Sequence, residues 1–514
     1  MPELIPKRSF TGCLTCKRRK KKCDEKRPQC NRCLLGGFDC LGYAHIEGYS
    51  SPSSTYKPAD NGSAQLNTII QPGLLGNESQ SMTVDYLPNG TFLPLVNHSG
   101  TRMHFNRSPL FHIHKYSSTI PRSPQIGPFE RDNMVDLIVS QYVRIAQRAL
   151  FRPFPYAFNE AIAARARSSN IILKTMYLGA RIAQALPNHI NQHEYMDWID
   201  IFQRQISGTQ STMIEVDAAH LADRLSAHQG LSFFAFMLSN SQTGYSLLRQ
   251  GVPLFLQLAA KSPQVWTQDS AISISHALNP KRHEMSMFVL VDVILALAFG
   301  TPPLLNYDTT IHESEFGRGT YNFLEQVYSC PLILLILLAR INLARIARLT
   351  NQRSLNPGDI LKVEECVRSW SPTLDYTETP PESIARLAIQ ECWRLATLIY
   401  AYLGMCGADS ADERVQPLVS QMAQLTDTIE VGSLFETHAY IPCLVAGVAA
   451  RKEKHRAIFR RKIYASQNAD ACLLRGTGFV FVLDHLWHGA AVGGNPVTWE
   501  DYVNSRYATM PVDI

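Results

Sequence analysis

The sequence predicts a mostly all-α protein with three parts: a small cysteine-rich N-terminal module, a disordered linker and a large α-helical domain. Two observations predict this organisation. Six of the twelve cysteines lie within residues 13–40, and from residue 128 onward apolar side chains recur at the 3.6-residue period of a helix. We therefore expect the parts at residues 7–43, 44–127 and 128–514. With 45% hydrophobic and 18% charged residues, the chain is neither collagen-like, rod-like nor wholly disordered.

The N-terminal part is strongly basic. Residues 1–43 contain eleven Lys and Arg against four Asp and Glu, a net charge of +7, whereas the remaining residues sum to −2. A basic segment on a nearly neutral body predicts a localised anionic partner. No apolar leader sequence is present at the N-terminus, so we expect a reducing compartment in which the cysteines remain thiols.

The N-terminal cysteines repeat one spacing. The unit C-x2-C-x6-C occurs twice, 17 residues apart, at Cys13, Cys16, Cys23, Cys30, Cys33 and Cys40. Zinc prefers four tetrahedral ligands and binds thiolates well. Six sulfurs complete two such sites only if two sulfurs bridge both ions, and the repeat makes Cys13 and Cys30 the natural bridges. The sequence therefore predicts two zinc ions, with Cys16 and Cys23 on one. Cys33 and Cys40 are expected on the other.

Two alternatives remain for this cluster. A single four-cysteine zinc site would leave Cys23 and Cys40 without a role, although they occupy matched positions in the two units. Disulfides are disfavoured by the expected compartment. A segment of about 30 residues has too small a core to fold alone, and metal binding contributes ~10 kcal/mol or more of folding free energy. We therefore expect zinc to stabilise this module.

Six consecutive cations separate the second and third cysteines: Lys17, Arg18, Arg19, Lys20, Lys21 and Lys22. We expect them along about one and a half turns of helix, pointing in several directions. Some can then face base edges in a major groove while others reach phosphates. A nuclear-localisation signal and a solvated charge run are the alternatives, but neither needs a metal-bound support. The run therefore favours nucleic-acid binding.

These residues carry a family resemblance. Ser9–Tyr43 resembles the fungal binuclear zinc–cysteine cluster DNA-binding domain with every cysteine in register, and Pro28 matches the proline between the two halves of that domain. The resemblance implies a zinc-dependent transcription factor in the nucleus that regulates RNA polymerase II genes and recognises CGG-like triplets in double-stranded DNA. It also implies that Arg19 and Lys20 contact base edges, whereas the other four cations contact phosphates or bases.

Residues 44–127 predict a disordered linker. Twelve Ser, eight Pro, seven Gly and six Asn among 84 positions leave no helical period, and such a segment buries too little apolar surface to fold. Many members of the fungal family place a coiled-coil dimerisation helix soon after the cluster. Here Gly48, Pro52 and Pro58 interrupt that position, so we expect any homo- or heterodimer to form through the helical domain.

The third part predicts one large all-α domain. An apolar stripe runs along residues 134–149, and similar patterns predict further helices at residues 171–186, 285–299, 332–349, 382–403 and 415–429. The helix at 382–403 should be buried on nearly every side, because only a narrow stripe of it is polar. Phe479–Leu483 is an apolar run compatible with helix or strand. Asp292, within an apolar run, is expected to be a hydrogen-bonded buried acid.

The segments VDV at 291–293 and FGTPP at 299–303 extend the resemblance to the fungal-specific helical regulatory domain, more loosely, across Pro128–Val503. This domain implies transcription machinery or co-regulators as partners. The sequence predicts no enzyme, because metalloprotease, nucleophile-elbow, P-loop and dinucleotide motifs are missing. The most apolar stretch, residues 330–339, is half the length that spans a bilayer, so no membrane partner is expected.

Two other functions stay open at this level. The chain could be a zinc-containing interaction protein or corepressor that does not recognise DNA sequence, or an enzyme with a zinc-binding head. Salt-dependent binding to duplex DNA distinguishes a DNA-binding protein from the first of these, since phosphate contacts release counterions.

Overall fold

The computed structural model describes twelve stretches of the chain: residues 11–19, 21–27, 29–36, 40, 128–152, 157–186, 192–208, 217–312, 323–351, 356–372, 379–465 and 476–512. The chain divides into two units, residues 1–79 and 80–514, and each is described by itself. The linker expected at residues 44–127 lies outside the described residues, as do Lys20 and Pro28.

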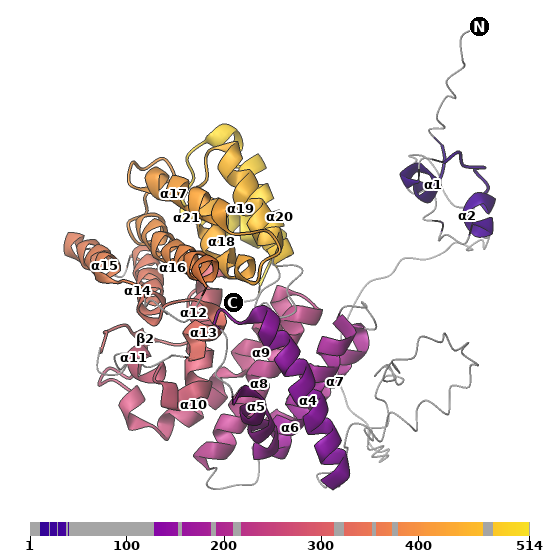
Figure 1. Cartoon of the computed structure of the whole chain (residues 1–514). Coiled ribbons are helices and arrows are strands. Elements are labelled where there is room, and N and C mark those ends of the chain that lie inside the picture. The colour runs from indigo at the N-terminus through magenta and orange to yellow at the C-terminus, as the bar shows by residue number, and fades with distance from the viewer. Residues whose placement is uncertain are drawn as a thin grey trace, which may run out of the picture. The chain divides into compact units, whose positions relative to one another are not determined.

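The described part of the first unit contains two five-residue helices, α1 (Leu14–Arg18) and α2 (Asn31–Leu35) (Figure 1). Each begins directly after a cysteine. The Sγ atom of Cys13 accepts the Cys16 backbone N–H at 3.4 Å, and that of Cys30 accepts the Cys33 N–H at 3.3 Å. Helices this short are not stable alone. They are held instead by packing around a buried cluster of cysteine side chains.

The helical domain begins with seven helices that pack largely on their neighbours in sequence: α4 (Pro128–Ala149), α5 (Phe158–Ser168), α6 (Asn170–Ala185), α7 (Gln192–Gly208), α8 (Ala218–Leu238), α9 (Ser241–Gln250) and α10 (Val252–Ala260). Short capped turns join several of them. The Ser169 hydroxyl accepts the Ile172 N–H where α6 begins, and the Asn240 carboxamide accepts the Thr243 N–H where α9 begins. The turn at Asn240 returns the chain, so α9 packs against α8, which also contacts α6 and α7.

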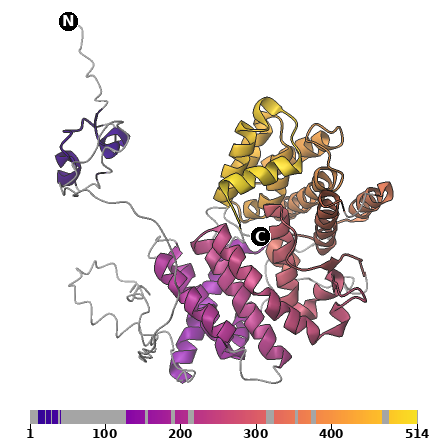
Figure 2. The same ribbon diagram turned by 180° about the vertical axis from the view of Figure 1, so that it is seen from behind.

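The rest of the domain adds eleven α-helices within the described residues: α11 (Ile274–Ala277), α12 (His283–Phe299), α13 (Phe323–Tyr328), α14 (Leu332–Leu349), α15 (Pro357–Ser369), α16 (Pro380–Tyr400), α17 (Val415–Thr428), α18 (Tyr440–Ala449), α19 (Glu453–Ala465), α20 (Gly476–His488) and α21 (Trp499–Thr509). Helices α4–α10 gather at one end of the domain and α16–α21 at the other, with α12–α14 between them (Figures 1 and 2). The strands β1 (Ile272–Ser273) and β2 (Tyr307–Asp308) form a two-stranded parallel sheet. Among the described helices, none has the length and apolar character needed to cross a membrane.

The mostly α-helical architecture is confirmed. Every helix expected from periodicity is present as α4, α6, α12, α14, α16 or α17. The run Phe479–Leu483 belongs to α20, where Phe481 is exposed and its neighbours are buried, as one face of a helix requires. On α16, even the polar residues Arg386, Gln390 and Thr397 are buried, so this helix is enclosed on nearly every side.

Asp292, in the middle of α12, ties this helix to the loop that follows it. Its carboxylate accepts hydrogen bonds from the Leu304 N–H and the Tyr307 hydroxyl, both at 2.8 Å. Burial raises the pKa of Asp292 to about 7, although these hydrogen bonds act to lower it. Helix α12 then ends at Gly300, whose φ of 65° favours glycine and whose missing side chain leaves room for Val503. The expected hydrogen-bonded acid is present at 292.

Candidate metal centre and its basic segment

The six N-terminal cysteines come together at the centre of the first unit. All are buried except Cys40, which is partly buried. The Cys13 Sγ lies 3.6 Å from the Cys30 Sγ, and the Cys16 Sγ lies 3.7 Å from the same atom. A disulfide would require about 2.05 Å. The sulfurs are separate thiols that share one small space.

The sulfur atoms form two groups of four, within each of which all atoms lie within 4.8 Å of one another. The first group consists of Cys13, Cys16, Cys23 and Cys30, and the second of Cys13, Cys30, Cys33 and Cys40. Four sulfurs bound tetrahedrally to zinc at ~2.3 Å would lie about 3.8 Å apart. The separations near 3.7 Å agree with that geometry, so the donor set suits zinc. Cys13 and Cys30 are the members that both groups share.

The protein environment opposes charge on the bare thiols. Burial raises the pKa of Cys30 to about 11, and it also raises the pKa values of Cys13, Cys16 and Cys33. Thiolates are the form that binds zinc, so metal binding releases protons and supplies the positive charge that buried thiolates need.

The repeat seen in the sequence is also a repeat in space. The Cys13 N–H donates to the Cys23 Sγ at 3.4 Å, and the Cys30 N–H donates to the Cys40 Sγ at 3.4 Å. Both pairs are ten residues apart and both hold the last cysteine of a unit against the first. The two C-x2-C-x6-C repeats therefore use equivalent hydrogen bonds, and each repeat brings its three sulfurs to the centre.

Asp24 connects the two C-x2-C-x6-C repeats, a role that sequence analysis missed. Its Oδ2 accepts the Asn31 N–H at 2.9 Å and its Oδ1 lies 3.4 Å from the Arg32 nitrogen, so the carboxylate caps the start of α2. Partial desolvation acts against ionisation, but the backbone N–H groups outweigh it and lower the pKa of Asp24. An acid directly after Cys23, within a basic segment, is the one signal for this role in the sequence.

The basic segment is less helical than predicted. Helix α1 ends at Arg18, the Arg19 N–H donates to the Thr15 carbonyl at 3.1 Å, and Lys21 is already in irregular backbone. The prediction of one and a half helical turns across all six cations is therefore wrong. Because Cys16 and Cys23 must both reach the sulfur cluster, the chain turns back after a single helical turn.

The described cations lie on the outside of the sulfur cluster. Lys17, Lys21 and Lys22 are exposed, and Arg19 is partly exposed. Lys20 and the side chain of Arg18 lie outside what the structure describes. The segment thus presents positive charge to solvent from a backbone that is held at both ends by buried cysteines.

Two family models match this chain. Residues 11–49 match the fungal Zn(2)-Cys(6) binuclear cluster domain, and residues 193–510 match the fungal-specific transcription factor domain. The second match spans more than half of the chain, which therefore belongs to the fungal-specific transcription factor family. The two matched domains are those of zinc-binding, DNA-binding regulators of transcription, and the nucleus is the usual location of such proteins.

Curated relatives are also transcription regulators. Over 50 residues, the chain is 46% identical to an uncharacterized transcriptional regulatory protein of Schizosaccharomyces pombe. The aligned residues are 10% of this chain and 9% of the relative. It is 39% identical over 69 residues to the aspercryptin biosynthesis cluster-specific transcription regulator of Emericella nidulans (13% and 11%). It is 50% identical over 43 residues to white-opaque regulator 2 of Candida albicans (8% and 10%). The chain thus spans about a tenth of the length of these relatives, and no solved structure matches it.

Proposed function

We propose that the protein is a sequence-specific, zinc-dependent transcription factor for RNA polymerase II genes, and that its N-terminal module recognises CGG-like triplets in the major groove. The observation that carries this proposal is the pair of four-sulfur groups that share Cys13 and Cys30, next to a run of consecutive cations. A metal-bound anchor at each end of the run would restrict its side chains to one arrangement, which base recognition requires and general phosphate attraction does not.

The proposed metal assignment is two zinc ions with Cys13 and Cys30 bridging. Cys16 and Cys23 complete one site, and Cys33 and Cys40 complete the other. Two Zn²⁺ and six thiolates sum to about −2, so the charge of +7 on residues 1–43 becomes about +5. The loaded module therefore remains attracted to DNA phosphates.

The proposed DNA contacts divide the basic segment into two roles. Arg19 and Lys20 contact base edges, and an arginine can donate two hydrogen bonds to the O6 and N7 acceptors of guanine. The remaining cations contact phosphates or bases: Lys17, Arg18, Lys21 and Lys22. Arg19 suits the first role because it follows α1 directly, where the Thr15 carbonyl holds its backbone.

The wider organisation is proposed on the same basis. The DNA-binding module comprises residues 7–43, a linker comprises residues 44–127, and the regulatory domain comprises residues 128–514. The matches at residues 11–49 and 193–510 support this division. We place the protein in the nucleus, with homo- or heterodimers formed through the helical domain and with transcription machinery or co-regulators as further partners.

In vitro selection of random duplex DNA by the full-length, zinc-loaded protein tests the proposal. We expect enrichment of a CGG-like triplet and loss of binding when a chelator removes the metal. The matched control is the same chelator saturated with zinc beforehand, which should leave binding unchanged. Retention of all DNA sequences alike would favour the zinc-containing interaction protein, which does not recognise base sequence.

A further inference from the structure

The helical domain contains a cavity of about 820 Å³. Its walls come from α4, α6 and α8, and from α12, α13 and the 3-10 segment Leu434–Ala439. Small-molecule sites in proteins usually occupy 300–1,000 Å³, whereas ordinary cores contain few voids larger than a water molecule. A space of this size is therefore large enough to hold a small molecule.

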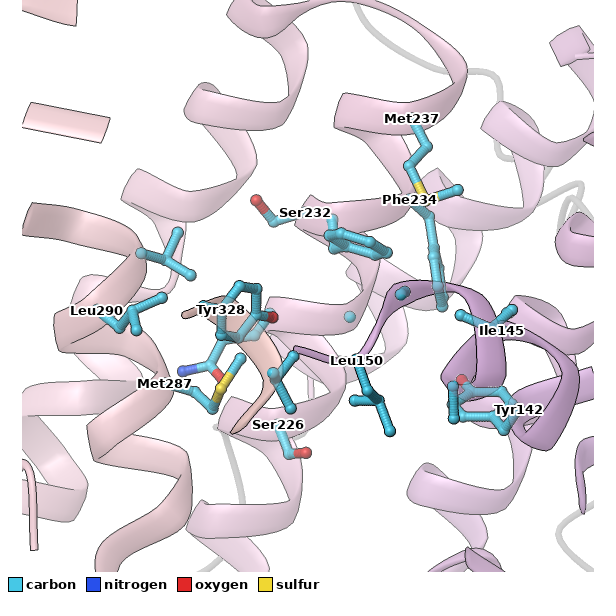
Figure 3. A pocket seen from close by; sticks show the side chains of 18 of the residues that line it. Tyr142, Ile145, Leu150, Ser226, Ser232, Phe234, Met237, Met287, Leu290 and Tyr328 are labelled. Carbon is cyan, nitrogen blue, oxygen red and sulfur yellow. The ribbon is translucent and has the colours of Figure 1, made fainter. Parts of the chain in front are cut away.

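Most of the cavity wall is apolar. Figure 3 shows side chains from separate helices directed into one space, with α4 on one side and α12 and α13 on the other: Tyr142, Ile145, Met287, Leu290 and Tyr328. Phe234 and Met237 of α8 add to the same lining. A ligand that fills this space gains affinity mainly by removing apolar surface from water.

The only permanent charge among the described lining residues is already balanced. Arg165 forms ion pairs with Asp223 and Glu284, each at 3.0 Å. The other titratable lining residues with positive forms are His283 and His438. Burial lowers both of their pKa values, that of His438 to about 4. Because no cation is left to balance a buried anion, the cavity favours an uncharged ligand.

Two tyrosine hydroxyls supply hydrogen-bonding capacity. Tyr142 and Tyr328 line the cavity, and neither hydroxyl has a hydrogen-bond partner among the residues that the structure describes. Both side chains keep some accessible surface, yet burial raises the pKa of Tyr328 to about 12 and also raises that of Tyr142. This combination arises because the accessible surface faces the cavity rather than bulk water. Neutral phenols of this kind donate hydrogen bonds to an acceptor.

His438 adds a third polar group without a complete set of partners. Its ring packs edge-on against Phe151 with centroids 5.2 Å apart, and a hydrogen bond links it to the Ala149 backbone. Its Nε2 has no partner in the described part of the chain. Buried polar atoms are rarely left unsatisfied, so this nitrogen at the cavity indicates room for a further polar group.

The cavity has an opening. Ala157 and Ala161 line it and are also exposed to solvent, which places the opening beside α5. The Arg165 ion pairs connect α5 to α8 and α12 at this rim. A small molecule can therefore enter without unfolding of the domain.

We propose that this cavity binds an uncharged, mainly apolar small molecule whose hydrogen-bond acceptor is contacted by the hydroxyl of Tyr142 or Tyr328. The site belongs to the helical domain and is separate from the zinc module in the chain. It thus adds a ligand-binding activity to the DNA binding proposed above. A ligand that binds the folded domain alone also stabilises it against unfolding.

Prodan, a neutral naphthalene ketone whose emission shifts to the blue in apolar surroundings, provides the test with the full-length protein. We expect one saturable site per chain and a higher midpoint of thermal unfolding. Met287→Trp fills the cavity and should weaken prodan binding at least about tenfold. Met196→Trp on α7 is the matched control, because Met196 is a half-buried methionine outside the cavity, and it should bind as the wild type does. Equal binding by both variants would place the dye elsewhere and overturn the proposal.

The hydrogen-bonding part is tested by the double variant Tyr142→Phe/Tyr328→Phe, which keeps both rings. We expect it to bind prodan about three- to tenfold more weakly, while competition by the parent hydrocarbon naphthalene is unchanged. Tyr464→Phe, at an exposed tyrosine of α19, should leave both values unchanged. If Met287→Trp fails to fold by circular dichroism, this variant decides alone. Unchanged prodan affinity in the double variant would contradict the proposal.

Discussion

The Sγ atoms of Cys13 and Cys30 lie 3.6 Å apart, and both sulfurs belong to both four-sulfur groups. The same two sulfurs also accept the backbone N–H groups of Cys16 and Cys33, at the start of α1 and α2. Each of these cysteines therefore joins a helix terminus to the shared centre of the site. A change at either one disturbs both groups, whereas a change at Cys16 disturbs the first.

Zinc stoichiometry tests this relationship. The full-length protein is expected to carry two zinc ions per chain, measured by plasma mass spectrometry after exhaustive dialysis. Cys13→Ala and Cys30→Ala should each lose both ions, since both sites then lack a ligand, and Cys16→Ala should lose about one. Cys366→Ala, in the helical domain, is the control and should keep the wild-type zinc content. One zinc per wild-type chain would contradict the shared-sulfur assignment.

The proposed difference between cations that contact base edges and cations that contact phosphates gives a second prediction. Arg19→Ala should cost ~1–3 kcal/mol of binding free energy on the selected DNA site and flatten the base preference there. Lys7→Ala, outside the cysteine cluster, should weaken binding to all DNA alike and reduce the slope of log affinity against log salt by ~1. Fluorescence anisotropy on matched and scrambled duplexes at several salt concentrations measures both effects. The assignment of base contacts fails if the two variants behave alike.

The cysteine site could be predicted because its information is local. C-x2-C-x6-C repeats place three ligands within a dozen residues of one another, and zinc chemistry then restricts how six sulfurs can be shared. The end of α1 could not be predicted in this way. Lys and Arg are good helix formers, so the local sequence favours continued helix through Lys22. Cys23 must return to the cluster, however, and that long-range demand ends the helix at Arg18.

The cavity could not be predicted, for a different reason. Periodicity correctly placed Tyr142 on the buried side of α4, and the same pattern would arise in a tightly packed core. Whether that core is full depends on α4, α8, α12 and residues 434–439, which are far apart in the chain. Local patterns show which face of a helix is buried, not how completely the facing helices fill the space.

A buried ion pair predicts a strong effect on stability. The Lys462 Nζ lies 2.8 Å from the Glu436 Oε1 and donates to the Ile429 carbonyl at 2.7 Å, and neither charged side chain is exposed by more than 2%. Lys462→Met should lower the free energy of unfolding by about 3–5 kcal/mol, because it leaves the Glu436 carboxylate buried without a counter-charge. Urea unfolding followed by circular dichroism measures the loss.

The matched control for this pair lies one residue away. Arg461 and Asp427 form an ion pair at 2.6 Å with both side chains about half exposed, so Arg461→Met should cost only about 0–1 kcal/mol. The double variant Lys462→Met/Glu436→Gln should be more stable than Lys462→Met alone, because it removes the stranded charge. A loss as small as that of Arg461→Met would show that solvent reaches the Lys462 pair.

Asp292 predicts a specific pH dependence of stability. Burial raises its pKa to about 7 in the folded chain, against ~3.9 in an unfolded chain. Between these values the folded state keeps a proton that the unfolded state releases, so this group makes folding progressively less favourable as pH rises from about 4 to 7. The full effect, present above the folded pKa, is roughly 4 kcal/mol at 1.36 kcal/mol per pKa unit. Asp292→Asn has no such proton and should lose less stability than the wild type between pH 5 and pH 8.

Urea unfolding at both pH values measures the difference, and Asp136→Asn, at an exposed position on α4, should keep the wild-type dependence. Parallel curves for Asp292→Asn and the wild type would mean that the carboxylate is already ionised at pH 5 and that its hydrogen bonds to Leu304 and Tyr307 outweigh its burial.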